Sequence, residues 1–263
     1  MAKRSKRMRA MAEKAPSNEP LSILIKSGES SVLIDAGEAD YGADVASYIK
    51  AQNIEKLDYV ISTHPHSDHL GGVSEVLSTV GTDKIILPKL PDDMVPTTAT
   101  YEKFLETVQK FGMKLTPATA GTKYNLDCGA VMEILAPVKS NYDNLNDFSV
   151  VVRFTHGENT FLFTGDIEAD AEKDLLDEGT LTDTDVLKVA HHGSSTSSRK
   201  KFLEAVLPEY AVIMCGNDNS YNHPNEKVVD RIGGFTQNIY RTDLNGTIVF
   251  KSDGKILNIE KEK

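Results

Sequence analysis

Four side chains of the kinds that bind metal ions lie within six residues: His64, His66, Asp68 and His69. Pro65 separates the first two in an extended segment, so their imidazoles point the same way. Asp68 and His69 follow one tight turn later. Such a group could hold one metal ion or bridge two, whereas the alternative is a cluster of surface histidines. Imidazole and carboxylate suit zinc, iron or manganese, and the absence of thiolate leaves the metal open.

The elements expected around this motif place it at the edge of a sheet. Residues 57–63 are predicted to form a buried strand, and a helix is expected near 73–77. Gly71 and Gly72 between them let the backbone turn sharply. In open α/β sheets, ligands usually bind beyond the carboxyl ends of the strands. The motif is therefore expected at a ligand-binding edge.

Further candidate residues follow strands in the second half of the chain. Strands over 149–155 and 160–166 form a predicted hairpin that places Asp166 at a strand end. A third strand, over 185–190, is followed directly by His191 and His192. These residues are expected at the same kind of edge as the first motif.

Two other histidines have less certain surroundings. His223 lies in a polar loop immediately before Pro224, which is expected at the first turn of a helix. It is a candidate for catalysis, and the alternative is a helix-entry residue with no catalytic part. His156 lies in the predicted hairpin turn and is interpreted as an exposed turn residue.

The remaining pattern alternates strands with helices in both halves of the chain, and each half begins with a hairpin. This indicates an α/β protein with two mixed sheets packed face to face and helices outside, an αββα four-layer sandwich. No Gly, Ser or Pro linker divides residues 21–263, so they are predicted to form one domain. Helices are expected near 43–52, 101–111, 169–176, 201–206 and 225–231, and further strands near 21–25, 31–37, 84–88, 113–118, 131–135 and 210–215.

Charge is distributed unevenly over the 263 residues, whose formal net charge is −10. Residues 1–20 carry six basic and two acidic groups, a balance of +4, which leaves −14 for the rest. An acidic body argues against a broad nucleic-acid-binding surface. The basic start could touch nucleic acid or an anionic membrane, but a basic flexible leader over residues 1–20 is the favoured interpretation.

Composition also bears on location and on cysteine chemistry. No apolar run reaches the roughly 18 to 20 residues of a membrane helix, and no secretory signal is recognisable. The chain is therefore predicted to be cytoplasmic, without an integral membrane segment. Cys128 and Cys215 have no metal-binding spacing and are interpreted as small buried hydrophobic residues. The oligomeric state cannot be deduced from these features.

The motifs together resemble the metallo-β-lactamase superfamily. The H-x-H-x-D-H spacing follows an apolar strand, and the stretches SVLIDAGE, FLFTGD and DVLKVAHHGSS accompany it. Within the superfamily, these stretches and the segment 219–224 are most similar to the hydrolase domain at the carboxyl end of the DNA-uptake protein ComEC and to its free-standing relatives. The resemblance covers residues 21 to about 258. It implies the αββα fold and a metal-dependent hydrolase.

The resemblance also implies a ligand set. His64 and His66 would hold one metal ion, Asp68 and His69 a second, and Asp166 would bridge the two. His191 is the first choice to complete the second site, with His192 as the alternative; all seven residues are candidate ligands. Asp35 would support the histidine loop by hydrogen bonding. One or two divalent ions, zinc or manganese, are expected as cofactors.

The expected chemistry follows from these metal ions. A bound metal lowers the pKa of water from about 15.7 towards 7, which makes hydroxide available as the nucleophile at neutral pH. Two metals roughly 3.5 to 4 Å apart also stabilise the attacking and leaving oxygens of a phosphoryl transfer. Asp68 and His223 are the expected catalytic residues. His223 would contact the scissile phosphate or protonate the leaving group.

Two departures from the family pattern stand out. Many relatives have another metal-binding histidine between the two halves, but this chain has none between His69 and His156. Asn146 or Asp147 in the segment 144–149 is therefore considered as an oxygen ligand. At the start, Pro20 stands where relatives usually have a turn after a first strand, so that strand is expected to be absent or replaced.

The leading functional hypothesis is a ComEC-like phosphodiesterase or nuclease. Its substrate would be a phosphodiester or other small ester, including single-stranded or short nucleic acid. A lactonase or other ester hydrolase is the enzymatic alternative, because the same hydroxide attacks carbonyl groups. A catalytically weak binding or regulatory member of the fold is the third hypothesis.

Overall fold

The computed structural model describes residues 8–12, 21–217, 219 and 221–263. Two mixed sheets form its centre. The first has eight strands in the order β15-β14-β1-β2-β3-β4-β5-β6, and the second has seven in the order β13-β12-β11-β10-β9-β8-β7. Strands β3 to β6 run parallel to one another, and so do β10 to β13. The arrangement matches the two mixed sheets expected from the sequence.

The strands follow the apolar runs of the sequence. Those of the first sheet are β1 (Met8–Ala12), β2 (Ile23–Ser27), β3 (Ser30–Ile34), β4 (Leu57–Ile61), β5 (Thr82–Leu87), β6 (Leu115–Pro117), β14 (Ile248–Ser252) and β15 (Leu257–Lys261). Those of the second are β7 (Lys123–Asn125), β8 (Val131–Ala136), β9 (Val151–His156), β10 (Asn159–Phe163), β11 (Val186–Lys188), β12 (Tyr210–Ile213) and β13 (Asn238–Arg241).

Helices cover the outer faces of both sheets. The described residues contain α1 (Gly42–Ala51), α2 (Ser67–Leu70), α3 (Val73–Thr79), α4 (Ala99–Lys110), α5 (Ala169–Asp177), α6 (Lys200–Val206), α7 (Glu226–Gly233) and α8 (Thr242–Asn245). Short 3₁₀ turns are η1 (Ala39–Tyr41), η2 (Asp92–Met94), η3 (Asp127–Gly129), η4 (Asn146–Phe148) and η5 (Ala190–Gly193).

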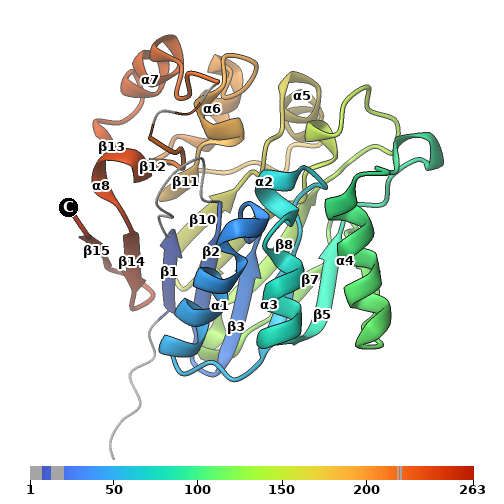
Figure 1. Ribbon diagram of the computed structural model, residues 1–263. Coiled ribbons are helices and arrows are strands. Elements are labelled where there is room, and N and C mark those ends of the chain that lie inside the picture. Colours follow the sequence, from blue (N-terminus) through green and yellow to red (C-terminus); the bar gives the residue numbers. More distant parts are fainter. Residues whose placement is uncertain (1–7, 13–20, 218, 220) are drawn as a thin grey trace, which may run out of the picture.

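Three apolar clusters hold the layers together. One lies between the sheets, where Ile34 and Ile61 of the first sheet join Val152 and Phe161 of the second. A second cluster packs α1, α3 and α4 on the first sheet, and a third packs α5, α6 and α7 on the other. Figure 1 shows α1, α3 and α4 in front of the first sheet. The αββα four-layer sandwich predicted from the sequence is thereby confirmed.

The start of the chain differs from the expectation. Met8–Ala12 form β1, which pairs antiparallel with both β14 and β2, although this stretch was predicted to belong to a flexible leader. The first strand was expected to be absent or replaced, and the structure has a strand, β1, over these residues. The rest of the predicted leader, residues 1–7 and 13–20, lies outside the described residues.

The interpretation of His156 as an exposed turn residue is wrong. It is the last residue of β9 and only 4% exposed. Its Nδ1 lies 2.8 Å from the Ser252 hydroxyl, which also donates to Asn159 at 2.7 Å. The hairpin turn is shorter than predicted, because His156 and Asn159 both pair within the sheet. His156 therefore ties the two sheets together, away from the predicted site.

Among the residues that the structure describes, no helix has the length and apolar character needed to cross a bilayer.

The topology brings the predicted site residues to one edge. His64 comes shortly after β4, Asp166 shortly after β10, and His192 shortly after β11. Parallel strands end at a common edge, and the two sheets meet there because the Val150 N–H donates to the Thr63 carbonyl at 2.9 Å. The candidate ligands from both halves therefore converge.

Candidate metal centre

Asp35 organises the loop that carries the first motif. One carboxylate oxygen accepts from the Thr63 N–H at 2.8 Å, and the other accepts from the Thr63 hydroxyl and from His69 Nδ1, both at 2.7 Å. The loop is also held close to residues 36 and 37, where a Cβ on Gly72 would lie 2.2 Å from the Ala36 carbonyl oxygen. Because Nδ1 of His69 carries the hydrogen bond to Asp35, its Nε2 is left for another ligand.

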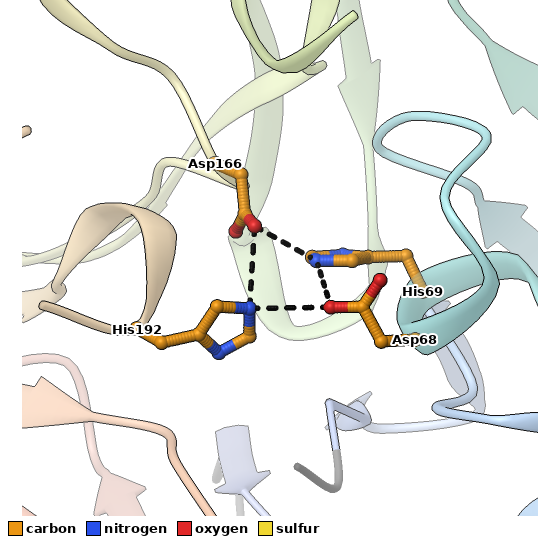
Figure 2. Close-up of side chains that lie close together, drawn as sticks. All are labelled: Asp68, His69, Asp166 and His192. Carbon is orange, nitrogen blue, oxygen red and sulfur yellow. Dashed lines mark ion pairs between the residues drawn. The ribbon is translucent and has the colours of Figure 1, made fainter. Parts of the chain in front are cut away.

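Asp68, His69, Asp166 and His192 form a compact group (Figure 2) whose ligand atoms all lie within 4.8 Å of one another. His69 Nε2 lies 3.1 Å from Asp166 Oδ2 and 3.6 Å from Asp68 Oδ2. His192 Nε2 lies 3.2 and 3.4 Å from the same two oxygens. Two imidazoles and two carboxylates thus face a common centre.

This group fits a divalent metal ion. Ligands bound tetrahedrally at about 2.0 to 2.2 Å lie about 3.3 to 3.6 Å apart, close to the separations observed here. Nε2 of His69 is buried and makes no hydrogen bond. His192 Nδ1 donates to the Met214 carbonyl at 2.9 Å, which directs Nε2 towards the centre. The donor set and its supporting hydrogen bonds therefore suit a metal.

The electrostatics are those of a cation site. Burial opposes protonation of His69, but the surrounding carboxylates outweigh it and hold its pKa well above the ordinary value. Burial alone would raise the pKa of Asp68, yet the neighbouring imidazoles hold it below its usual range. The carboxylates therefore stay ionised and favour a positive charge between them, so a metal ion would compete with the His69 proton.

Lys188 supports Asp166 from behind. Its side chain is 4% exposed, and its Nζ donates to the Gly165 carbonyl at 2.8 Å and approaches Asp166 Oδ1 at 3.4 Å. The cation lowers the pKa of Asp166 together with the histidines, against the effect of burial. It occupies one carboxylate oxygen, while Oδ2 faces the two imidazoles. Lys188 thus orients the carboxylate.

Of the two adjacent histidines, the structure brings His192 into the group rather than His191, the first choice from the sequence. Both residues have a left-handed backbone, with φ of 46° and 53°. This turn directs the buried His192 inward, whereas His191 Nδ1 lies 3.1 Å from Glu168 Oε1. Two consecutive left-handed residues other than glycine are uncommon, so the sequence alone could not decide between His191 and its alternative His192.

His64 and His66 lie beside this group as a second pair of donors. His64 Nε2 is 3.0 Å from His66 Nδ1, and the His64 and His69 rings are 4.1 Å apart. His64 Nδ1 faces the hydroxyls of Thr63 and Ser149, at 3.2 and 3.4 Å. Burial lowers the pKa of both imidazoles in the pair, which keeps them in the neutral form that binds metals.

A pocket of about 580 Å³ opens over both groups. It is lined by His66, Asp68, Asn146, Asp166, His191, His192, Tyr221 and His223, with further residues at 65, 67, 96, 98, 100 and 145. The His223 ring lies 6.1 Å from that of His192 and nearly parallel to it. Burial, together with His192 and His191, lowers the pKa of His223 to about 4. His223 is therefore placed to meet a substrate in neutral form.

Two residues that support the site were not predicted from the sequence. Glu168 contacts both His191 and Asn146, and Lys188 holds Asp166. Lys188 interrupts an otherwise apolar strand, and a charged residue within a buried strand signals a specific partner. No comparable signal marks Glu168.

The chain is similar to known proteins over most of its length. The family model described as metallo-β-lactamase superfamily matches residues 18–217. The chain is 28% identical to ComE operon protein 3 of Bacillus subtilis over 80% of its length, and 31% identical to competence protein ComA of Neisseria gonorrhoeae over 88%. It spans only 26% and 30% of those two proteins.

Solved structures share the fold. A metallo hydrolase of Ignicoccus hospitalis, Igni18, has a TM-score of 0.58 at 17% identity, with 93% of this chain and 98% of that chain covered. The metallo-β-lactamase fold protein YhfI of Bacillus subtilis has a TM-score of 0.60 at 15% identity, with 94% and 100% covered. With the family model matching most of its length, the chain belongs to the metallo-β-lactamase superfamily.

Proposed function

We propose that this protein is a metal-dependent phosphodiesterase, acting on phosphodiesters that include single-stranded or short nucleic acid. The observation that carries the proposal is the pair of adjacent donor groups, His64 with His66 and Asp68 with its three partners, under one pocket. Two neighbouring divalent ions suit phosphoryl transfer, because they neutralise charge on both the attacking and the leaving oxygen. The similarity to proteins named for competence and recombination supports a nucleic-acid substrate.

The residues present can hold the ions and position a substrate. His64 and His66 would hold one ion, and Asp68, His69 and His192 the other, with Asp166 between them. When bound, such ions lower the pKa of water enough to supply hydroxide at neutral pH. Asp35 and Lys188 keep His69 and Asp166 oriented, so that little reorganisation is needed during the reaction.

His223 is the candidate for contact with the scissile group. It lines the pocket beside His191 and His192 and is neutral near pH 7, with a pKa of about 4 caused mainly by burial. A neutral imidazole can donate a hydrogen bond to a phosphate oxygen. An anionic phosphate nearby would raise its pKa and favour proton transfer to the leaving group.

A substrate panel tests the proposal. Bis-p-nitrophenyl phosphate, single-stranded DNA and an acyl lactone are each incubated with the protein and added Mn²⁺ or Zn²⁺. Cleavage of the phosphodiesters is expected, and Asp166→Ala should abolish it. Asp177→Ala, which removes an exposed carboxylate outside the pocket, is the control. Hydrolysis of the lactone alone would replace the phosphodiesterase assignment with an ester hydrolase.

A further inference from the structure

The two groups of donors are unequal. Asp68, His69, Asp166 and His192 supply four ligand atoms to one position. The neighbouring position has two imidazoles, whose facing nitrogens are 3.0 Å apart. Catalytic metal positions usually have at least three protein ligands. No histidine lies between His69 and His156 to add to the pair, so a further donor must be of another type.

Asn146 presents a suitable atom. It lies in η4, at the wall of the pocket, and only 9% of its surface is exposed. Its Nδ2 donates to Glu168 Oε1 at 2.9 Å, while its Oδ1 is buried and accepts no hydrogen bond. A carboxylate can only accept, so Glu168 fixes which end of the amide faces it and turns Oδ1 the other way. A buried carbonyl oxygen in this state calls for a ligand.

The position of Asn146 matches the histidine pair. Asn146 and His66 line the same pocket. With Nδ2 held by Glu168, the unpartnered Oδ1 of Asn146 therefore lies in the wall of the pocket that His66 also lines.

Asp147, the other oxygen donor considered from the sequence, has hydrogen-bond partners on both carboxylate oxygens. Its Oδ1 accepts from the N–H groups of Glu168 and Ala171, at 2.7 and 3.2 Å, and its Oδ2 accepts from Asn144 at 2.8 Å. It is 2% exposed and fastens η4 to the start of α5. Asp147 thus builds the segment, and Asn146 is the residue turned into the pocket.

We propose that Asn146 Oδ1 is a further protein donor of the metal position built on His64 and His66, besides the Asp166 carboxylate that it would share with the other position, and that Glu168 is the positioning residue that fixes its amide. A neutral amide oxygen is a weaker and harder donor than imidazole. This position should therefore bind its metal ion more weakly than the four-ligand position and fill after it. Its preference for zinc over manganese should also be smaller. The inference shares with the proposed function only the premise that the pocket binds metal, and it is independent of the substrate.

The test measures metal binding rather than turnover. Metal-free protein is titrated with Mn²⁺ or with Zn²⁺ alone, and bound metal is counted by equilibrium dialysis with elemental analysis. Two binding steps are expected for the unaltered chain. Asn146→Leu should weaken the second step at least tenfold and leave the first unchanged. Asn258→Leu, at an exposed site on β15, is the matched control.

Three further variants test the inference if Asn146→Leu folds poorly. Asn146→His supplies an imidazole and should strengthen the second Zn²⁺ step at least tenfold, with a smaller gain for Mn²⁺. In Glu168→Gln the new side-chain amide can donate as well as accept, so the orientation of Asn146 is no longer fixed. This variant should weaken only the second binding step, with the thermal midpoint of the metal-free protein unchanged. Glu168→Asp should retain part of the affinity of the second step.

The outcomes separate this inference from the proposed function. A second step with unaltered affinity in both Asn146 variants, or a single step in the unaltered chain at millimolar Mn²⁺, would overturn the role of Asn146. Two metals bound through Asn146 without phosphodiester cleavage would support the inference and refute the phosphodiesterase.

Discussion

At the scale of single residues, the site depends on which nitrogen of each imidazole is committed to the protein. Asp35 takes Nδ1 of His69 and the Met214 carbonyl takes Nδ1 of His192, so both rings present Nε2 to the same two carboxylates. Such supporting hydrogen bonds orient the rings before any metal arrives. Ligand identity therefore follows from the hydrogen bonds behind each ring as much as from the motif.

The two adjacent histidines provide a direct test of this view. His192→Ala should weaken the tighter metal-binding step at least a hundredfold, because one of four ligand atoms is lost. His191→Ala should change it less than tenfold, since His191 contacts Glu168 instead. Competition with a chromogenic chelator measures both. Equal losses in the two variants would contradict the assignment of His192.

His223 is expected to contact the substrate rather than to bind a metal ion. His223→Ala should lower kcat for a phosphodiester by roughly 10² to 10⁴-fold, the usual contribution of a general acid or base, with metal content unchanged. Asp177→Ala, which removes an exposed carboxylate outside the pocket, serves as the control. Unchanged turnover in the His223 variant would show that it is only a helix-entry residue.

At the scale of elements, the sequence predicted most helices and strands to within a few residues. Apolar runs such as 57–61 and the spacing of Phe104 and Val108 in α4 decide these local structures. The features that the sequence left undecided or did not predict have a common cause, because β1 and the inward turn of His192 depend on distant partners. β1 forms between β2 and β14, which are more than 200 residues apart in the chain.

One contact between elements should affect stability. Glu172 on α5 is 1% exposed and accepts the N–H groups of Ser198 and Arg199, which fixes the loop before α6. Burial raises its pKa to about 7 from an ordinary 4.5. Between these values the folded state holds a proton that the unfolded chain releases, so raising the pH lowers the free energy of unfolding, by on the order of 3 kcal/mol in total.

Glu172→Gln removes that titration. Between pH 4.5 and pH 7, the free energy of unfolding of the variant should therefore increase relative to that of the unaltered chain. Above pH 7 the difference between the two should stay constant. Urea unfolding of the metal-free proteins at four pH values measures it. A constant difference would show that Glu172 does not titrate in this range.

At the scale of the whole molecule, the first sheet is continuous only because β1 fills the space between β14 and β2, as Figure 1 shows. Without it, both neighbouring strands would present unpaired N–H and C=O groups, and such edges favour association between chains. The carboxyl-terminal hairpin of β14 and β15 would also lose its link to the rest of the sheet. The strand that the sequence did not predict is thus expected to have a global effect.

Two truncations separate the contribution of the strand from that of its charge. Removing residues 1–7 eliminates four basic groups and leaves β1, whereas removing residues 1–12 eliminates the strand and one further basic group, Arg9. The longer truncation should lower Tm by at least about 5 °C, because about 2 kcal/mol suffices for such a shift at this size. It should also increase light scattering at the same protein concentration. The shorter truncation should change Tm by no more than about 2 °C and should leave light scattering unchanged. Equal effects of the two truncations would assign the stabilisation to charge rather than to β1.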